Sequence, residues 1–391
     1  MYPKSLVLIL DVKKGVRFLK IQLASPDLDE SDIQAVLDVL RSGRLALGSN
    51  IVKFEQAISN YVGVKYAVAV NSGTSALHLI VRALGISPGD EVLVPSFTFA
   101  ASVNALLYEG ATPVFVDIEP ETFNLDPCDF ERKITPRTKA IMAVDVFGHP
   151  AEWDEISRIA DKYSLRVIDD SCEALGADYK EHRIGQFGDA AVFAFYPNKQ
   201  ITTGEGGIVV TDNKEIADLC RSMRNQGRGE MGAWLRHDRL GFNYRMDEMS
   251  AALGVSQLKR IETFLAKREQ VAGWYNEQFA GLEWVQPPVV KSYVRKSWFV
   301  YVVTLAEGLE REPAMNELEK QGVPCRGYFS PVHLQPYIRE QYGCKEGDLP
   351  ITESIARRTI ALPFHNNLCL EEVNYVVGAL KSAVSKLWRI S

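Results

Sequence analysis

The middle of the chain alternates short strand-like runs with helix-like runs, and this alternation constrains the fold more than any other feature. Tyr66–Val70 reads YAVAV and predicts a buried strand, and Ser75–Leu84 then predicts a helix. Further strands are expected over Glu91–Val94, Val114–Asp117, Ala140–Phe147, Arg166–Asp169, Ala190–Phe195 and Ile208–Thr211, with helices over Ala100–Tyr108 and Glu152–Tyr163. The pattern predicts an α/β fold whose mostly parallel sheet is covered by helices on both faces and binds ligands at the carboxyl ends of its strands.

Helical patterns dominate on both sides of this region. Residues 29–43 show apolar side chains at helical spacing and acidic residues in the first turn. Other expected elements are helices over Phe54–Tyr61, Lys214–Arg224, Asp247–Leu265 continuing into Arg268–Phe279, Glu312–Gln321 and Glu371–Trp388, and a strand over Trp298–Leu305. We predict an N-terminal extension over residues 1–22, a large domain over residues 23–280 and a smaller α+β domain over residues 281–391.

Composition excludes several classes of protein. The 391 residues are 46% hydrophobic and 24% charged, with a net charge of −6, so nothing indicates binding to nucleic acid or to an anionic membrane surface. The longest apolar runs are far shorter than the ~20 residues of a membrane helix. The apolar run at residues 5–10 ends at Asp11, too early for a signal peptide. Six scattered cysteines without a CxxC pair predict neither disulfides nor a metal site, and the cytoplasm is the expected location.

Lys199 lies in an unusual sequence environment. It follows the strand-like run that ends at Phe195 and precedes TTGEGG, a stretch that can turn sharply and bring backbone close to a ligand. A lysine in such a place can form a Schiff base when its amine is partly neutral. The plain alternative, an exposed loop lysine, is the better reading for a lysine chosen at random.

A second candidate site is the stretch NSGTS at residues 71–75, between an expected strand and an expected helix. Gly73 permits a tight turn, and the hydroxyls of Thr74 and Ser75 accompany the first free amides of the helix, a common arrangement for binding phosphate. The alternative is an ordinary Ser/Thr helix cap. Neither GxGxxG nor GxxxxGK[ST] occurs, so the sequence does not indicate a dinucleotide or ATP.

Three further stretches follow expected strands or lead into helices. Asp170 ends the run RVIDD, where a buried carboxylate needs a cationic partner such as a protonated pyridine nitrogen; capping the next helix is the alternative. Phe99 in PSFTF can stack on a flat ring, although core packing is the commoner role. The segment GFNYRM at residues 241–246 carries little information by itself.

A phosphate site, a carboxylate, an aromatic ring and a lysine at one edge of a sheet together suit pyridoxal 5′-phosphate (PLP). The chain resembles the DegT/DnrJ/EryC1/StrS family of sugar aminotransferases, which are fold-type I PLP enzymes. The resemblance runs from about Leu23 to near the C-terminus, and its five motifs are NSGTSALHL, PSFTFAASVNA, VIDDSCEALGA, FAFYPNKQITTGEGG and GFNYRMDEMSAA. The N-terminal extension lies outside it.

The resemblance implies roles for single residues. Lys199 matches the lysine that binds the cofactor covalently, Asp170 the carboxylate at the pyridine nitrogen, and Phe99 the stacked ring. Gly73, Thr74 and Ser75 match the phosphate turn.

Other positions vary within the family. Glu173 occupies a position against the cofactor ring that is often Gln or His in relatives. Asn243 matches a residue that reaches the phosphate from the neighbouring subunit, which implies a homodimer with a shared active site. Ala194 stands where many members have a phosphate-binding serine, so one hydroxyl is missing here, and Tyr196 is a candidate replacement. The presence of Lys199 argues against the branch of dehydratases that carry His instead.

The expected activity is transfer of an amino group from L-glutamate to a nucleotide-linked keto-sugar. The segments that border the substrate cleft in relatives contain Arg228, Arg245, Tyr328 and His333, for each of which a surface or packing role is the alternative. An aminotransferase acting on a keto-cyclitol or an aminobenzoate precursor would use the same motifs. A non-catalytic regulator with this fold would be expected to lack Lys199 or Asp170, and both are present.

Overall fold

The computed structural model describes residues 8–11, 16–19, 21–229 and 236–388. Its centre is a seven-stranded sheet with the strand order β3-β11-β10-β7-β6-β4-β5. The strands are β3 (Tyr66–Val70), β4 (Glu91–Pro95), β5 (Thr112–Val116), β6 (Thr138–Val144), β7 (Arg166–Asp170), β10 (Ala190–Ala194) and β11 (Gly207–Thr211). Neighbouring strands are parallel except that β11 is antiparallel to both β10 and β3. The prediction of a mostly parallel sheet is confirmed.

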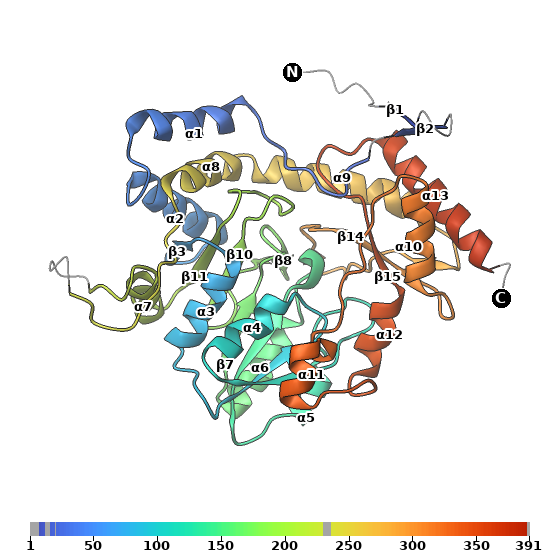
Figure 1. Cartoon of the computed structure of the whole chain (residues 1–391). Coiled ribbons are helices and arrows are strands. Elements are labelled where there is room, and N and C mark those ends of the chain that lie inside the picture. Colours follow the sequence, from blue (N-terminus) through green and yellow to red (C-terminus); the bar gives the residue numbers. More distant parts are fainter. Residues whose placement is uncertain (1–7, 12–15, 20, 230–235, 389–391) are drawn as a thin grey trace.

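Helices cover both faces of this sheet, as predicted (Figure 1). One face packs against α3 (Gly73–Ala83), α4 (Ala100–Tyr108) and α7 (Lys214–Arg224). The other face packs against α2 (Ser49–Val62), α6 (Trp153–Tyr163), α8 (Glu248–Leu258) and the first part of α9 (Ile261–Phe279). Each side chain of a buried strand therefore enters one of two apolar layers, which explains the continuous hydrophobic runs in the sequence.

A second core lies beside the first, at the right of Figure 1. It contains the antiparallel sheet β12 (Val285–Gln286), β14 (Tyr301–Leu305) and β15 (Thr359–Leu362), packed against the end of α9, α10 (Arg311–Lys320) and α13 (Leu370–Trp388). Ile21 packs into it as well, so both ends of the described chain contribute. The predicted division at residue 280 stays a prediction, because α9 runs through both cores.

Several expected elements have different bounds in the structure, and the physical reason is plain for two of them. The strand expected from Trp298 begins only at Tyr301, because Trp298 has a φ of +53°, which an extended strand cannot contain. The helix expected over Asp247–Leu265 is two helices, since α8 ends at Leu258 and α9 begins at Ile261.

Shorter elements were not predicted. Near the N-terminus β1 (Leu8–Asp11) and β2 (Val16–Leu19) pair antiparallel, within the predicted N-terminal extension. The helix expected over residues 29–43 is α1 (Glu30–Ser42). The other elements that were not predicted are α5 (Pro127–Arg132), β8 (Asp178–Tyr179), β9 (His182–Arg183), β13 (Val294–Arg295), α11 (Pro336–Tyr342), α12 (Pro350–Arg358), η1 (Val146–Gly148) and η2 (Val332–Leu334). In the part of the chain that the structure describes, no helix is both long and apolar enough to cross a membrane.

Candidate active site

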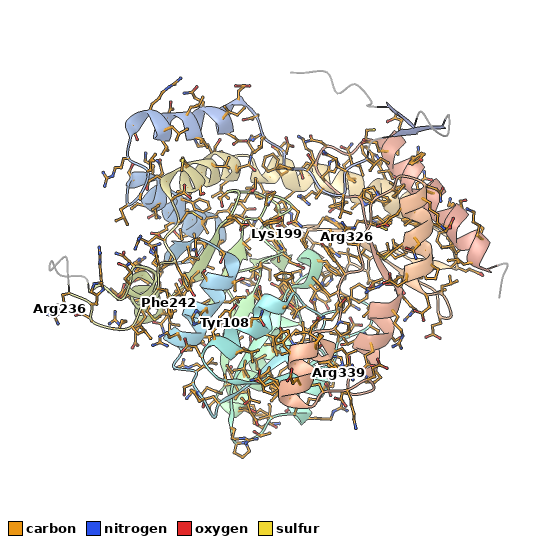
Figure 2. All side chains as sticks on the ribbon, in the orientation of Figure 1. Tyr108, Lys199, Arg236, Phe242, Arg326 and Arg339 are labelled. Atoms are coloured by element: carbon orange, nitrogen blue, oxygen red, sulfur yellow. The ribbon has the colours of Figure 1, made fainter. Side chains whose placement is uncertain are left out.

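The carboxyl ends of five strands meet at one edge of the central sheet. Because β3 and β10 are both antiparallel to β11, they run in the same direction as β4, β6 and β7. The ends of β3, β4, β7 and β10 lead into the stretches that contain Gly73, Phe99, Asp170 and Lys199, and Figure 2 shows Lys199 near the centre of the molecule. The prediction that these stretches lie at the same edge is therefore confirmed by the topology.

Lys199 lies in a tight turn after β10, where its amide donates a hydrogen bond to Tyr196 O at 2.9 Å. Its side chain is 13% exposed, and Nζ lies 3.7 Å from Glu173 Oε1. On another side, Nζ lies 3.7 Å from the centre of the Phe299 ring. The amine is thus held between a carboxylate and the face of an aromatic ring, and it is not a lysine of an exposed loop.

Glu173 is buried beside Lys199. Its Oε2 accepts a hydrogen bond from the Phe147 amide at 2.8 Å, which fixes the carboxyl group from the side opposite the amine. Burial raises the pKa of Glu173, and this outweighs the attraction of the Lys199 charge. A carboxyl group in this position can hold a proton near the lysine more readily than an exposed glutamate.

Asp170 is the last residue of β7 and is 4% exposed. Ser102 Oγ donates to Asp170 Oδ2 at 2.7 Å, and the Cys172 amide donates to Oδ1 at 3.2 Å. Among the described residues no ion pair to Asp170 is found, so this buried carboxylate has hydrogen bonds but no cation. A buried carboxylate in that state is suited to a cationic ligand such as a pyridinium nitrogen.

Two more buried carboxyl groups, which the sequence did not single out, lie behind Asp170. Asp145 follows β6, and its Oδ2 accepts a hydrogen bond from Ser171 Oγ at 3.0 Å; the same hydroxyl also contacts Asp169 Oδ1. Burial raises the pKa of Asp145 to about 7, and burial next to Asp145 raises that of Asp169 well above its usual range. The pair therefore retains a proton at neutral pH. The consecutive aspartates at 169 and 170 were the only sequence signal for it.

The turn before α3 is closely packed. A Cβ atom on Gly73 would lie 2.9 Å from Ala194 Cβ and 3.0 Å from Cys172 Sγ, and one on Gly207 would lie 2.4 Å from the Ser72 carbonyl oxygen. Only glycine therefore fits at these two positions, and their absence of side chains brings the start of α3 against the ends of β10 and β11.

The three predicted phosphate ligands, Gly73, Thr74 and Ser75, differ in whether the hydrogen bonds of this turn already engage them. Ser72 Oγ caps α3 by accepting from the Ser75 amide at 3.1 Å, and the two hydroxyls lie 2.9 Å apart, so Ser75 is engaged within the turn. Gly73 and the half-buried Thr74 remain at the start of an 11-residue helix, where the amides favour an anion.

Phe99 immediately precedes α4, and the residue is 66% exposed. A large aromatic ring left open at this edge is available for stacking rather than core packing. Together with the amine of Lys199, the carboxylate of Asp170 and the helix start at Gly73, the ring makes a set of groups that fits PLP.

The predicted substrate residues Tyr328, Arg228 and Arg245 lie in two places, and Asn243, predicted to bind the cofactor phosphate, lies with the two arginines. Tyr328 stacks on Phe147 with ring centres 6.3 Å apart, so it lies close to Glu173, and its pKa is raised, first by burial and then by that carboxylate. Arg228, Arg245 and Asn243 lie instead around Asn225: Arg245 Nη1 donates to Asn225 Oδ1 at 2.9 Å, and Asn243 pairs with Asn225 through the backbone.

His333 is buried with both ring nitrogens engaged. Nδ1 lies 2.7 Å from Ser96 Oγ, and Nε2 lies 3.2 Å from Glu353 Oε1. The pKa of His333 is lowered, chiefly by burial. In this position the side chain links the end of β4 to α12, which corresponds to the packing alternative considered for it from the sequence.

Comparisons with known proteins agree with this geometry. The family model of the DegT/DnrJ/EryC1/StrS aminotransferase family matches residues 26–381. The chain is 42% identical to GDP-perosamine synthase of Caulobacter vibrioides, covering 92% of this chain and 97% of that protein. It is 36% identical to dTDP-3-amino-3,4,6-trideoxy-alpha-D-glucose transaminase of Streptomyces venezuelae, covering 94% and 95%. The solved PLP form of Spr1654 from Streptococcus pneumoniae superimposes with a TM-score of 0.89 at 30% identity, covering 94% and 99%.

Proposed function

The chain belongs to the DegT/DnrJ/EryC1/StrS aminotransferase family, and from this premise we propose that it moves an amino group from L-glutamate to a keto carbon of a nucleotide-linked sugar. It is an aminotransferase with PLP as its cofactor, and its fold is that of the fold-type I enzymes. The names of the relatives, which include a GDP-linked and a dTDP-linked amino-sugar product, support a nucleotide-linked substrate.

The position of Lys199 carries the proposal. Its amine lies 3.7 Å from Glu173 Oε1 at the edge that also holds Asp170 and the start of α3. We assign Gly73 and Thr74 to the cofactor phosphate, Phe99 to one face of its ring and Asp170 to its ring nitrogen. When bound, PLP accepts the electrons left behind as a proton leaves the carbon next to the donor nitrogen.

Lys199 serves as the proton carrier in this proposal. Once its amine is free and neutral, it takes a proton from the donor's α-carbon. It then delivers a proton to the carbon on the other side of the donor nitrogen. Glu173 lies within reach to keep that amine oriented and to exchange a proton with it, and Tyr328 closes the same side. The buried surroundings limit access of water to these groups.

A homodimer completes the proposed site. The long edge of α1 and α2 exposes apolar side chains that a monomer would leave in water: Ile33, Leu37, Leu40, Leu45, Leu47 and Val52. Asn243 is exposed and is free to face a second copy. The cytoplasmic location and the glutamate donor stay predictions.

The test compares Lys199→Ala with Lys162→Ala, which removes an exposed lysine that pairs with Glu131 at 2.7 Å on the surface. Each PLP-loaded protein is incubated with L-glutamate and a panel of nucleotide keto-sugars, and product masses are recorded. Lys199→Ala should lose at least about 10³-fold in turnover, since it removes both the attachment point and the proton carrier, while Lys162→Ala keeps wild-type activity. Normal turnover by Lys199→Ala would exclude the assignment, and amination of non-sugar ketones alone would exclude the sugar substrate.

A further inference from the structure

Arg268 is an arginine of α9 that is 3% exposed and whose donors reach only main-chain carbonyl oxygens. Nη1 donates to Trp298 O at 2.9 Å and to Phe299 O at 3.1 Å. Nη2 donates to Lys199 O at 2.9 Å and contacts Asn198 O at 3.5 Å. One guanidinium thus joins two segments that are about a hundred residues apart in the sequence.

These two segments carry the groups that meet at the amine. Lys199 Nζ lies 3.7 Å from the centre of the Phe299 ring, and Arg268 holds the carbonyl groups of both residues. Fixing the two main chains against one planar group therefore fixes how the amine approaches the ring. The two ends of a guanidinium can serve two pairs of carbonyls at once, which a lysine ammonium cannot do.

Arg268 also lies where the two cores meet. On α9, Phe264 and Leu265 belong to the core under the central sheet, and Val271 and Tyr275 belong to the second core. Arg268 stands between these two pairs, and beyond Phe299 the chain enters β14 of the second sheet. The same guanidinium therefore sets the position of the lysine relative to the second core.

The charge of Arg268 is only partly balanced: Asp27 attracts it from a distance, and the centre of the Phe364 ring lies 5.7 Å from its guanidinium carbon. Among the described residues no ion pair to Arg268 is present, and its Nε is buried without a partner. Burial lowers the pKa of Arg268 to about 10. A buried cation held by neutral carbonyls is costly, and an apolar side chain of similar length would pack there at lower cost. Its presence is therefore better explained by the geometry that it imposes than by packing.

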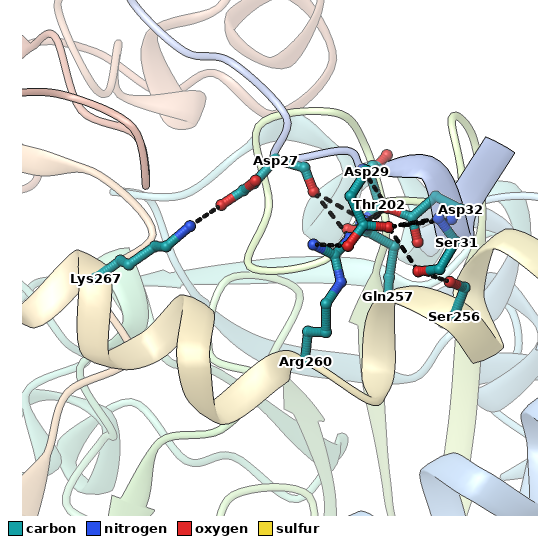
Figure 3. A network of polar contacts seen from close by, with 9 residues as sticks. All are labelled: Asp27, Asp29, Ser31, Asp32, Thr202, Ser256, Gln257, Arg260 and Lys267. Carbon is teal, nitrogen blue, oxygen red and sulfur yellow. Dashed lines mark hydrogen bonds and ion pairs between the residues drawn. The ribbon is translucent and has the colours of Figure 1, made fainter. Parts of the chain in front are cut away.

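A second contact from the α8–α9 region reaches the same loop, as Figure 3 shows. Gln257 Oε1 accepts a hydrogen bond from the Thr202 amide at 3.4 Å, and its Nε2 donates to Asp32 Oδ2 at 2.6 Å. The loop that contains Lys199 is thus held at residue 199 by Arg268 and at residue 202 by Gln257.

We propose that Arg268 is a positioning residue that holds Lys199 against Phe299 and so presents its amine to the cofactor. The proposal rests on the proposed function, because it takes Lys199 to be the residue that binds PLP. By this proposal α9 takes part in the reaction through Arg268, which positions Lys199. No atom of Arg268 needs to touch the cofactor or the substrate.

The test measures how fast Lys199 captures the cofactor, independently of turnover. Wild type, Arg268→Met and Arg268→Lys are stripped of PLP and mixed with it, and samples are reduced with borohydride at timed intervals. The mass of the peptide that contains Lys199 then gives the captured fraction. Both variants should capture PLP about 10- to 100-fold more slowly than wild type, since misplacement by about an ångström has effects of this size. Their kcat should fall while KM for the sugar changes by less than about threefold.

Arg358→Met is the matched control. Arg358 also donates to a main-chain carbonyl, Leu305 O at 2.9 Å, but on α12, and its loss should leave capture at the wild-type rate. Capture at the wild-type rate by either folded Arg268 variant would overturn the proposal, and failure of both to fold would show that Arg268 is required for stability instead. If wild type itself gives no reduced adduct on Lys199, the proposed function fails as well; an adduct in wild type with equal rates in all variants removes only the role of Arg268.

Discussion

At the scale of single residues, the four buried carboxyl groups behind the sheet edge differ in what balances their charge. Glu173 faces the Lys199 amine, and Asp170 accepts hydrogen bonds from the Ser102 hydroxyl and the Cys172 amide. Asp145 and Asp169 instead share the hydroxyl of Ser171, and no cation lies against them among the described residues. Burial therefore raises the pKa of both of these groups, and the pair keeps a proton at neutral pH.

The first prediction concerns the pH dependence of stability. The pKa of Asp145 is about 7 in the folded chain and 3.8 as its ordinary value, so the folded state binds more protons between these values. The contribution of Asp145 to the free energy of unfolding should therefore be fully present below about pH 4 and be lost, by up to a few kcal/mol, as the pH rises through about 7. Asp145→Asn stays neutral, keeps an oxygen for the Ala151 amide, and should flatten this decline.

Urea denaturation midpoints of both proteins between pH 5 and pH 8, with PLP at saturation, provide the measurement. Asp154→Asn, on the surface of α6, serves as the control and should follow wild type. Parallel curves for wild type and Asp145→Asn would contradict a shared proton in this pair.

The second prediction follows from Ala194. This residue packs against Gly73 at the start of α3, and the family resemblance implies a serine at its position, so we expect the phosphate to lack one hydroxyl donor here. Ala194→Ser should bind PLP more tightly by about 1 kcal/mol, or roughly fivefold in Kd, because a hydroxyl can donate to a phosphate oxygen. Thr74→Val is the matched substitution, which removes a hydroxyl at the same helix start and should raise the Kd for PLP. Titration of cofactor-free protein by fluorescence gives both values, and a Kd for Ala194→Ser equal to or above that of wild type would exclude the missing-donor interpretation.

Sequence reasoning found the residues of the site that carry a local pattern. Lys199, Asp170 and Gly73 each follow a strand-like run, so strand ends and glycine turns were enough to single them out. Phe299 and Arg268 were missed because each meets Lys199 from a segment 69 or more residues away, and a lone Phe or Arg in an amphipathic stretch has no distinguishing signal. Asp145 was missed because its partner is on the neighbouring strand.

At the scale of elements, long strands and helices were predictable and short ones were not. The run at Tyr66–Val70 and the helix at Lys214–Arg224 have the predicted bounds because five or more residues suffice to show a period. The two-residue strands β8, β9 and β13 have no period to detect, and they depend on pairing between distant segments. The positive φ of Trp298, which shortens the strand there, is likewise set by its surroundings.

The third prediction concerns how α1 is fastened to α9, shown in Figure 3. Asp32 is 1% exposed and pairs with Arg260, which also reaches Asp29 at 2.8 Å. Arg260→Met should destabilise the protein by about 2 to 4 kcal/mol, since it leaves the buried carboxylate of Asp32 with only the Gln257 amide and its own helix cap. The double variant Asp32→Asn/Arg260→Met should recover much of that loss, because no buried charge remains.

A double-mutant cycle on urea denaturation midpoints measures the coupling. Lys267→Met, which removes a half-exposed pair to Asp27, should cost less than about 1 kcal/mol. Additive effects of the two single substitutions would show that Asp32 and Arg260 do not depend on each other.

At the scale of the whole molecule, α9 connects the two cores and passes over the edge at which the strands end. The amine of Lys199 therefore lies between the central sheet and a separate aromatic cluster that contains Phe299, with Phe147 in it and Tyr328 packed against it. The exposed apolar side chains of α1 and α2 lie on the large core, on which a second copy can bury them. The homodimer stays a prediction from the family resemblance, since a single chain carries no direct sign of its partner.

The fourth prediction tests whether the site is shared between subunits. Asn243 is exposed, so it can face a second copy. The carbonyl oxygen of the next residue, Tyr244, accepts a hydrogen bond from the Asn71 amide, so Asn243 also lies near the phosphate turn of its own chain. It can therefore act within one chain or across a dimer. Lys199→Ala and Asn243→Ala chains, each with little activity at limiting PLP, are mixed in equal amounts and allowed to exchange subunits. If Asn243 acts across the interface, each mixed dimer contains one site with both Lys199 and Asn243 intact and one with neither. Random pairing then restores about a quarter of the wild-type sites. If Asn243 acts within its own chain, every site of a mixed dimer lacks one of the two residues, and the mixture should show only the average activity of the parent proteins.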